Sequence, residues 1–438
     1  MNFEGIKQAV EKSALACGAD GFEIKISKSV SAGAEALKDE ISTVSYSNSG
    51  SITVRCVKEG KSGYAASENV SPETAEQLVI RACANALVVD DKDEVPLFAG
   101  SDHYEKVEEK EVHMPSAEEL KEHTLQLQKQ LYVCSDKVVD GSQSFTSAAE
   151  VESAFMNSAG LMLTYKAALV AHGAIAAVKD GEESAESFEI ALVEGDTCEE
   201  LSRRVVDSAL NKLGAEPVES GKYNIIIQDK TMSSLLAVYE SVFSARSAFL
   251  KTTLLAGKEG QEIASNVVTL VDDPFHPGKS LHCPFDAEGV AVYKKNVIEK
   301  GVLKTLLYNR MYASKFGKET TGNAASAKGI EAKGLYLAPG QLAKDELLAK
   351  LGNGIYITNL KGMHAGVDVQ SGAFSLEAEG FLVEDGKKTK PVKNFTIADN
   401  FFTVLKKIEA LSDRVVFPTQ SSYGAPDVLI TDINASGK

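Results

Sequence analysis

Apolar and polar positions follow a helical period in some segments of the first half of the chain and alternate as in strands in others. Amphipathic spacing or N-cap signals predict helices at 1–16, 71–87, 116–135 and 197–213. The intervening strand patterns fall at 22–30, 51–57, 63–67 and in several runs over 138–193. An acidic segment, 90–112, has few apolar residues and is predicted to be a linker.

The second half of the chain is predicted to contain more strands than helices. A compact apolar strand at 223–228 precedes a helix at 231–243, and further helices are predicted at 344–351 and 400–411. Further strands are predicted at 290–297 and 302–307. Neither half alternates strand and helix as a doubly wound parallel sheet would. The pattern therefore predicts an α+β protein of two domains, 1–215 and 222–438, each with a mainly antiparallel sheet and packed helices.

The segment 362–392 is the clearest hairpin signal in the chain. Phe374, Leu376 and Ala378 share one strand face, and the apolar phase flips at Gly380, which predicts a bulge or a close backbone approach. Asp385-Gly386 then fits a tight turn in which both central residues have positive φ. Glu377 and Glu379 share the opposite face, where paired carboxylates or, more simply, a solvated surface are predicted.

Composition and charge exclude several classes of function. The net charge is −16 over 438 residues, without a basic cluster, which opposes nucleic-acid binding. No apolar run reaches the roughly 18 residues of a membrane span. Charged residues within the first 16 positions are incompatible with a signal peptide, so a cytoplasmic protein is expected. Six scattered cysteines are then expected to be reduced and packed as small apolar side chains.

Several segments of the second half resemble the TldD/PmbA family, whose members are also known as modulators of DNA gyrase. The resemblance covers about 224 to the C-terminus well and the first half more loosely. It is carried by the hairpin segment and by four shorter motifs: 260–265 (GQEIAS), 320–323 (TTGN), 334–340 (GLYLAPG) and 352–356 (GNGIY). The resemblance implies a peptidase heterodimer, in which a zinc subunit (TldD) pairs with a metal-free one (PmbA, or TldE).

The zinc ligands that the resemblance implies for a TldD subunit are absent from this chain. That subunit carries H-E-x-x-x-H on a helix and a later cysteine, which leave an open position for water. On the predicted helix at 231–243, the two histidine positions fall at Ala237 and Val242, and the glutamate position at Val238. The C-terminal segment 415–430 contains no cysteine. The chain thus resembles the metal-free half, with no cofactor of its own and with zinc in its partner.

The resemblance implies a non-catalytic subunit that shapes the cavity and the interface of a complex with a TldD-like zinc subunit. Such a complex would cleave small or unfolded peptides. The residues implied to line the peptide channel lie in two loops, and they are Thr321, Gly322, Asn323, Met363 and His364. Backbone groups there or along a strand edge would hold an extended peptide.

Two rival functions use other features of the sequence. His276, His282 and Cys283 gather three potential ligands within eight residues, so a stand-alone metallopeptidase with a displaced site is one alternative. A metal-free homodimer that binds peptides or acts as a scaffold is the other. Three further histidines, spaced ten residues apart, are predicted to be surface residues without a function: His103, His113 and His123. Asp272-Asp273-Pro274 is predicted to form a turn at a strand end.

Overall fold

The structure is a computed structural model that describes residues 3–90, 95–108 and 112–438. It confirms the α+β class, because the described residues form three sheets that are mainly antiparallel, with helices packed on them. The chain divides into two compact units. Unit 1 comprises the described parts of Met1–Val178 together with Ser187–Val206 and Cys283–Ala291. Unit 2 comprises Lys179–Glu186, Asp207–His282 and Val292–Lys438.

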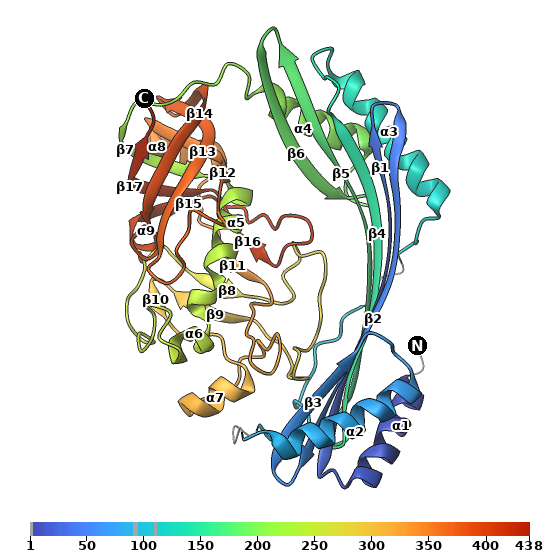
Figure 1. Ribbon diagram of the computed structural model, residues 1–438. Helices are drawn as coiled ribbons and strands as arrows, with labels where there is room; N and C mark the ends of the chain where they lie inside the picture. The colour runs from blue at the N-terminus through green and yellow to red at the C-terminus, as the bar shows by residue number, and fades with distance from the viewer. Residues whose placement is uncertain (1–2, 91–94, 109–111) are drawn as a thin grey trace. The chain divides into compact units, whose positions relative to one another are not determined.

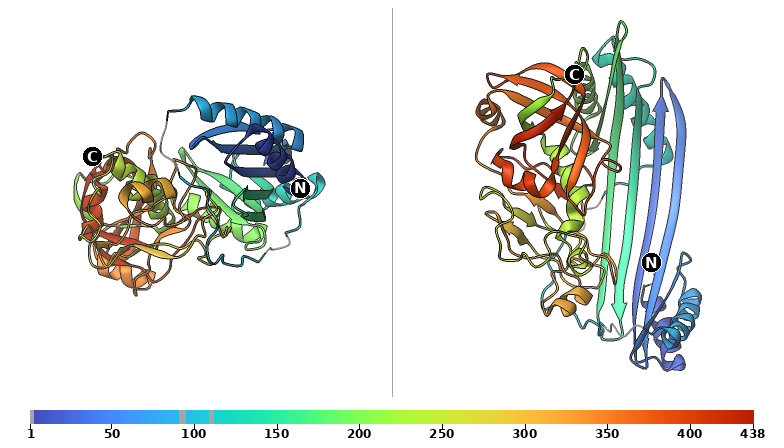
Figure 2. Two further views of the ribbon diagram at one scale, coloured as in Figure 1. Left: turned by 90° about the horizontal axis from the view of Figure 1, so that it is seen from below. Right: turned by 60° about the vertical axis from the view of Figure 1, so that its left-hand side comes forward.

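Unit 1 is built on a six-stranded sheet in the order β3-β2-β1-β4-β5-β6. Its strands are β1 (Gly21–Leu37), β2 (Glu40–Lys58), β3 (Lys61–Ser67), β4 (Gln143–Asn157), β5 (Met162–Asp180) and β6 (Glu183–Leu192). Four of them are 15 to 19 residues long and appear as the long ribbons of Figures 1 and 2. β1 pairs with β4 over its length without a register shift.

The helices of unit 1 pack near both ends of these long strands (Figure 1). Helices α1 (Phe3–Cys17) and α2 (Pro72–Val88) form a core with β1 and β2. The predicted apolar face of α1 is buried. Helix α3 (Ala117–Cys134) packs on β1 and β4 nearer the other end, and α4 (Cys198–Leu210) follows β6.

The predicted helix starts in unit 1 are confirmed by their caps. Ser71 accepts a hydrogen bond from the Thr74 amide at the start of α2. Ser116 and Glu119 form a capping box before α3. The amide of Thr197 donates to the Glu200 carboxylate at 2.9 Å, and the Glu200 amide donates back to the Thr197 hydroxyl at 3.2 Å. Each reciprocal pair satisfies amides that the first turn leaves unpaired.

The acidic linker packs more closely than predicted, although residues 91–94 and 109–111 lie outside the described part. Phe98 and Tyr104 join Phe155 and Leu161 in an apolar cluster. The Tyr104 hydroxyl donates to the carbonyl oxygen of Gly289 at 2.7 Å. Two aromatic side chains thus anchor a segment whose charged composition indicated little burial.

Unit 2 contains a closed sheet and an open one. The first runs β14-β13-β12-β7-β17-β15, and an additional pairing of β14 with β17 closes five of the strands into a ring. Its strands are β7 (Gly221–Ile227), β12 (Gly354–Lys361), β13 (Ala373–Glu384), β14 (Lys387–Asn400), β15 (Ile408–Leu411) and β17 (Val428–Ser436). The open sheet runs β10-β9-β8-β11-β16. Its short strands are β8 (Leu270–Asp272), β9 (Lys295–Glu299), β10 (Val302–Leu303), β11 (Leu335–Leu337) and β16 (Tyr423–Gly424).

The helices of unit 2 correct two sequence predictions. The helices of this unit are α5 (Asp229–Tyr239), α6 (Ala245–Phe249), α7 (Arg310–Phe316), α8 (Lys344–Leu351) and α9 (Phe401–Lys407). The helix predicted over 400–411 ends at Lys407, and the chain continues as β15. The helix predicted over 231–243 changes after α5 into a 3₁₀ turn, Glu240–Phe243. None of the described helices combines the length and apolarity that a membrane crossing requires.

The predicted hairpin is confirmed in β13 and β14. Asp385 and Gly386 have φ values of 50° and 74°, as a type I′ turn requires. Register shifts occur beside Gly380 on both neighbouring strands. A Cβ at Gly380 would overlap the carbonyl oxygen of Tyr356 on β12, so the glycine permits the close backbone approach that was predicted.

Candidate functional site

The end of α5 carries the three positions that correspond to the zinc-binding motif of a TldD subunit. Ala237 and Val238 are half-buried in the last turn of α5, and Val242 is buried in the 3₁₀ turn. All three side chains are hydrocarbon and have no lone pair to offer a metal. These positions therefore do not fit a zinc ion.

Polar side chains that the sequence analysis did not single out lie beside these positions. Strand β16 packs on α5, where the Ser233 hydroxyl donates to the Tyr423 carbonyl oxygen at 2.7 Å. The Tyr423 hydroxyl in turn donates to Glu240 Oε2 at 2.6 Å. The backbone amide of Ala332 donates to the other oxygen of the same carboxylate. Burial raises the pKa of Glu240 in spite of these two hydrogen bonds.

A fully buried carboxylate, Asp272, lies at the end of β8. Lys295 stands opposite it on β9, and its Nζ lies 3.0 Å from Asp272 Oδ2. The side chain of Asn323 donates to the same oxygen at 2.8 Å, while the amides of Lys333 and Gly334 donate to the other at 2.8 and 2.7 Å. Burial by itself would raise the pKa of Asp272. The Lys295 charge and the hydrogen bonds outweigh it and hold the pKa below its ordinary value.

Comparison with known proteins shows the family to which this fold belongs. The family model for the PmbA/TldA metallopeptidase C-terminal domain matches residues 220–437. The model for PmbA/TldA metallopeptidase domain 1 matches residues 22–86. The chain belongs to the PmbA/TldD family. The matched C-terminal domain contains α5, Glu240 and Asp272.

Individual relatives and structures agree with this family. A metalloprotease of Methanothermobacter thermautotrophicus is 34% identical over 293 residues, which cover 63% of this chain and 63% of the length of that relative. The metalloprotease PmbA of Escherichia coli O157:H7 is 25% identical and is covered over 96% of its length by 99% of this chain. A Thermotoga maritima structure, named as a modulator of a DNA gyrase, matches with a TM-score of 0.90 at 27% identity, over 99% of this chain and 100% of that one. TldE of Thermococcus kodakarensis shares the fold, with a TM-score of 0.88 at 22% identity over 99% and 100% of the two chains.

The residues of this PmbA/TldD chain that were predicted to line a peptide channel lie in two different settings. Thr321 and Asn323 are buried. The Thr321 hydroxyl accepts from the Tyr308 amide at 2.7 Å, and Asn323 belongs to the Asp272 network. Gly322, between them, is also buried. In contrast, Met363 is half-buried and His364 is exposed in the loop between β12 and β13, so only this loop presents side chains to solvent.

The three residues of the predicted displaced metal site are each engaged separately. The His276 ring packs between Tyr336 and Phe417, with centroid distances of 4.7 Å to each. His282 Nε2 lies 3.1 Å from the His276 carbonyl oxygen. The Cys283 thiol donates to the Phe285 carbonyl oxygen at 3.2 Å. In the described part of the chain, these residues do not form a group of converging ligand atoms.

Two further predictions about carboxylates have different outcomes. Glu377 and Glu379 share a strand face, where the Lys361 ammonium pairs with both carboxylates; the Glu377 side chain is 47% exposed and that of Glu379 only 14%. The predicted turn begins only at Asp273, whose Oδ1 accepts from the Phe275 amide at 3.0 Å. Asp272 is wrongly placed by that prediction, because it is the last residue of β8 and is fully buried. The prediction failed because Asp273-Pro274 follows directly, so the sequence resembles a turn motif although Asp272 still belongs to the strand.

Proposed function

We propose that this chain is the non-catalytic subunit of a TldD/TldE-type zinc metallopeptidase complex that degrades small or unfolded peptides. Its partner would be a TldD-like zinc subunit, and its own role would be to shape the cavity and the interface. The complex would be cytoplasmic, and the isolated chain would be able to form a homodimer. The observation that carries the proposal is the hydrocarbon character of Ala237, Val238 and Val242 at the end of α5.

The polar groups nearest to these positions support a structural role for this helix end. A hydrolytic zinc site needs a carboxylate that is free to take a proton from water. Both Glu240 oxygens already accept hydrogen bonds from the chain, and the residue is half-buried. The Glu240–Tyr423 pair instead ties the 3₁₀ turn to β16. This hydrogen bond holds the end of α5 in place, so we assign it a structural rather than a catalytic role.

The loop 362–372 is the part of the predicted channel that can contact a peptide directly. Met363 supplies an apolar side chain and His364 an exposed imidazole, which together suit sequence-tolerant contacts. The buried network of Thr321 and Asn323 would act indirectly, by holding the neighbouring backbone in place. In this proposal the exposed loop 362–372 contacts the peptide, and the buried residues Thr321 and Asn323 hold the backbone around them in place.

The test compares peptide degradation by three samples: this chain alone, its cognate zinc subunit alone, and the equimolar mixture. An unstructured peptide is the substrate, and cleavage is followed by mass spectrometry. The expected result is no hydrolysis by this chain and faster hydrolysis by the mixture than by the zinc subunit. Metal-dependent cleavage by this chain alone would overturn the proposal, as would a mixture no faster than the zinc subunit.

A loop variant tests the proposed contact with peptide. His364→Ala should lower kcat/KM of the mixture by about tenfold or less, because one exposed contact contributes about 1.4 kcal/mol at most. Co-purification with the zinc subunit should persist. The matched control is His113→Ala, another exposed imidazole, which should leave the kinetics unchanged. Equal kinetics of the two variants would remove this loop from the peptide path.

A further inference from the structure

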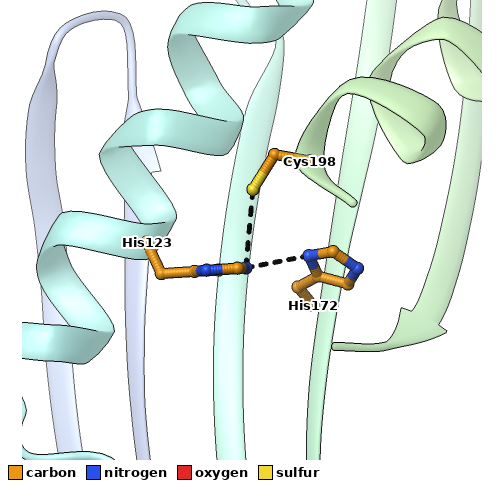
Figure 3. Close-up of side chains that lie close together, drawn as sticks. All are labelled: His123, His172 and Cys198. Atoms are coloured by element: carbon orange, nitrogen blue, oxygen red, sulfur yellow. Dashed lines mark hydrogen bonds between the residues drawn. The ribbon is translucent and has the colours of Figure 1, made fainter. Parts of the chain in front are cut away.

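Two histidines and a cysteine from distant parts of the sequence converge in unit 1. His123 lies on α3, His172 on β5, and Cys198 is the first residue of α4. Figure 3 shows the His123 ring reaching toward both of the others. His123 Nε2 lies 2.9 Å from His172 Nδ1 and 3.5 Å from Cys198 Sγ. The three ligand atoms lie within 4.8 Å of one another, and no other such group occurs in the described residues.

The hydrogen bonds among these three side chains do not satisfy all of their donor and acceptor atoms. His123 Nε2 carries either one proton or one lone pair, yet it faces both a ring nitrogen and a sulfur atom. His172 is fully buried, but its Nε2 has no hydrogen-bond partner within the part of the chain that the structure describes. This Nε2 is not the ring nitrogen that faces His123, so a metal bound at His172 Nδ1 would leave it protonated and unpaired. The competition for His123 Nε2 is therefore what indicates that the protein groups alone do not complete this cluster.

The spacing of the ligand atoms suits a small tetrahedral ion. Around zinc, two nitrogen ligands lie about 3.3 Å apart and a nitrogen and a sulfur about 3.6 Å apart, given the usual bond lengths. The observed 2.9 and 3.5 Å from His123 Nε2 are close to these values. The remaining pair, His172 and Cys198, lies within 4.8 Å, so side-chain rotations would have to close it by up to about 1.2 Å. Imidazole nitrogen and thiolate sulfur are also the ligands that zinc prefers.

We propose that His123, His172 and Cys198 bind a zinc ion, with a water molecule as the fourth ligand. His172 and Cys198 are buried, whereas His123 is half-buried, so the water would enter on the His123 side. The ion would join α3, β5 and the start of α4, three segments far apart in the sequence. It would therefore fix the first turn of α4 against the sheet of unit 1. The site is independent of the zinc that the proposed function assigns to the partner.

The metal-free protonation states are compatible with binding. Burial lowers the pKa of His123 and lowers that of His172 to about 4, so both rings are neutral and can each present a lone pair. Burial raises the pKa of the Cys198 thiol, although a hydrogen bond from its own backbone amide opposes that effect. Binding therefore releases the thiol proton as the Zn–S bond forms.

The experiment measures metal binding rather than peptidase activity, so its outcome does not depend on the proposed function. The full chain is stripped with a chelator, titrated with zinc, and then with cobalt as a spectroscopic probe. We expect one zinc per chain, a higher Tm with zinc, and a thiolate-to-cobalt charge-transfer band. Zinc binding too weak to compete with a mild chelator, or a cobalt complex without that band, would overturn the proposal.

Variants separate this site from adventitious binding. Cys198→Ala and His123→Asn should each weaken zinc binding by at least about tenfold, since even changes around a ligand cost that much. Cys134→Ala, at the other end of α3, is the matched control and should bind like the wild type. The metal-free Tm and circular dichroism of each variant establish that it folds. Folded variants that retain stoichiometric zinc would show that the ion lies elsewhere.

Discussion

At the scale of single residues, Asp272 and Lys295 form a buried ion pair in unit 2. The Asp272 side chain is completely buried and that of Lys295 is 7% exposed. The Asp272→Asn substitution would leave the ammonium without its counter-charge, so we expect a loss of about 3–5 kcal/mol in unfolding free energy. Urea denaturation measures it. Glu299→Gln, which removes the exposed partner of Lys304, should cost about 1 kcal/mol or less.

The same carboxylate gives unit 2 a defined pH dependence. The pKa of Asp272 is lower in the folded protein than the ordinary value of about 3.9 in the unfolded chain. Its contribution is therefore complete above about pH 4 and is lost as the pH falls through the folded pKa. The stability difference between wild type and Asp272→Asn should shrink as the pH is lowered from about 6 to about 3. A difference that stayed constant over this range would contradict the assignment.

Glu240 and Tyr423 give opposite predictions for two conservative substitutions. Tyr423→Phe removes the hydroxyl donor from a half-buried carboxylate, so we expect a loss of about 1–3 kcal/mol at neutral pH. Glu240→Gln keeps a hydrogen-bonding group of the same shape and removes the half-buried charge, which burial disfavours, so stability should be equal or higher. Thermal unfolding of both variants tests this pair. A strongly destabilised Glu240→Gln variant would show that the charge itself is needed there.

At the scale of elements, local signals predicted the boundaries that depend on local chemistry. Caps located the starts of α2, α3 and α4, because a side-chain oxygen pairs amides within three residues of itself. The lengths of β1 and β2, predicted at 22–30 and 51–57, were underestimated. The serine-rich stretches of these strands lack a strong apolar alternation, and pairing with neighbouring strands extends them.

The candidate site was less predictable than the elements. The absence of zinc ligands on α5 could be stated from the sequence, since it needs only residue identity. The Asp272 network and the cluster of His123, His172 and Cys198 could not, because strand register and helix docking bring their members together. His123 was wrongly predicted to be a plain surface residue for this reason. Its partners lie 49 and 75 positions away along the chain.

Gly380 provides the prediction that belongs to this scale. Gly380→Ala should destabilise unit 2 by several kcal/mol, because its Cβ would overlap the Tyr356 carbonyl oxygen and force β12 and β13 apart. Gly221→Ala, at the exposed start of β7 in the same sheet, is the control. A Cβ there meets only a side-chain carbon of Tyr223 at 3.7 Å. Equal denaturation midpoints for the two variants would mean that the sheet accommodates the extra carbon.

At the scale of the whole molecule, the course of the chain explains why a single domain boundary is hard to read from the sequence. Unit 1 includes Cys283–Ala291, and unit 2 includes Lys179–Glu186. Phe285 shows the physical cause in unit 1, since it packs with Phe155 and Leu161 more than 120 positions away. The predicted division at 215–222 stays a prediction about the domains. Tertiary packing, rather than local composition, therefore determines to which unit such short segments belong.

Net charge leads to a prediction about the substrates of the proposed complex. With −16 at neutral pH, this chain attracts cations and repels anions over distances comparable to the Debye length, about 8–10 Å at physiological salt. A subunit that contributes such a surface to a peptidase should favour cationic peptides at the encounter step. We therefore expect kcat/KM of the complex to be higher for a lysine-rich unstructured peptide than for a glutamate-rich one of equal length.

Salt dependence distinguishes this long-range attraction from specific recognition. Raising the ionic strength from about 0.05 to about 0.5 M should reduce the preference several-fold, because screening acts on steering and not on a buried contact. The zinc subunit alone, measured with the same two peptides, is the control that isolates the contribution of this chain. A preference that persists unchanged at high salt would place the selectivity in direct contacts, for which the exposed loop of Met363 and His364 is the first candidate.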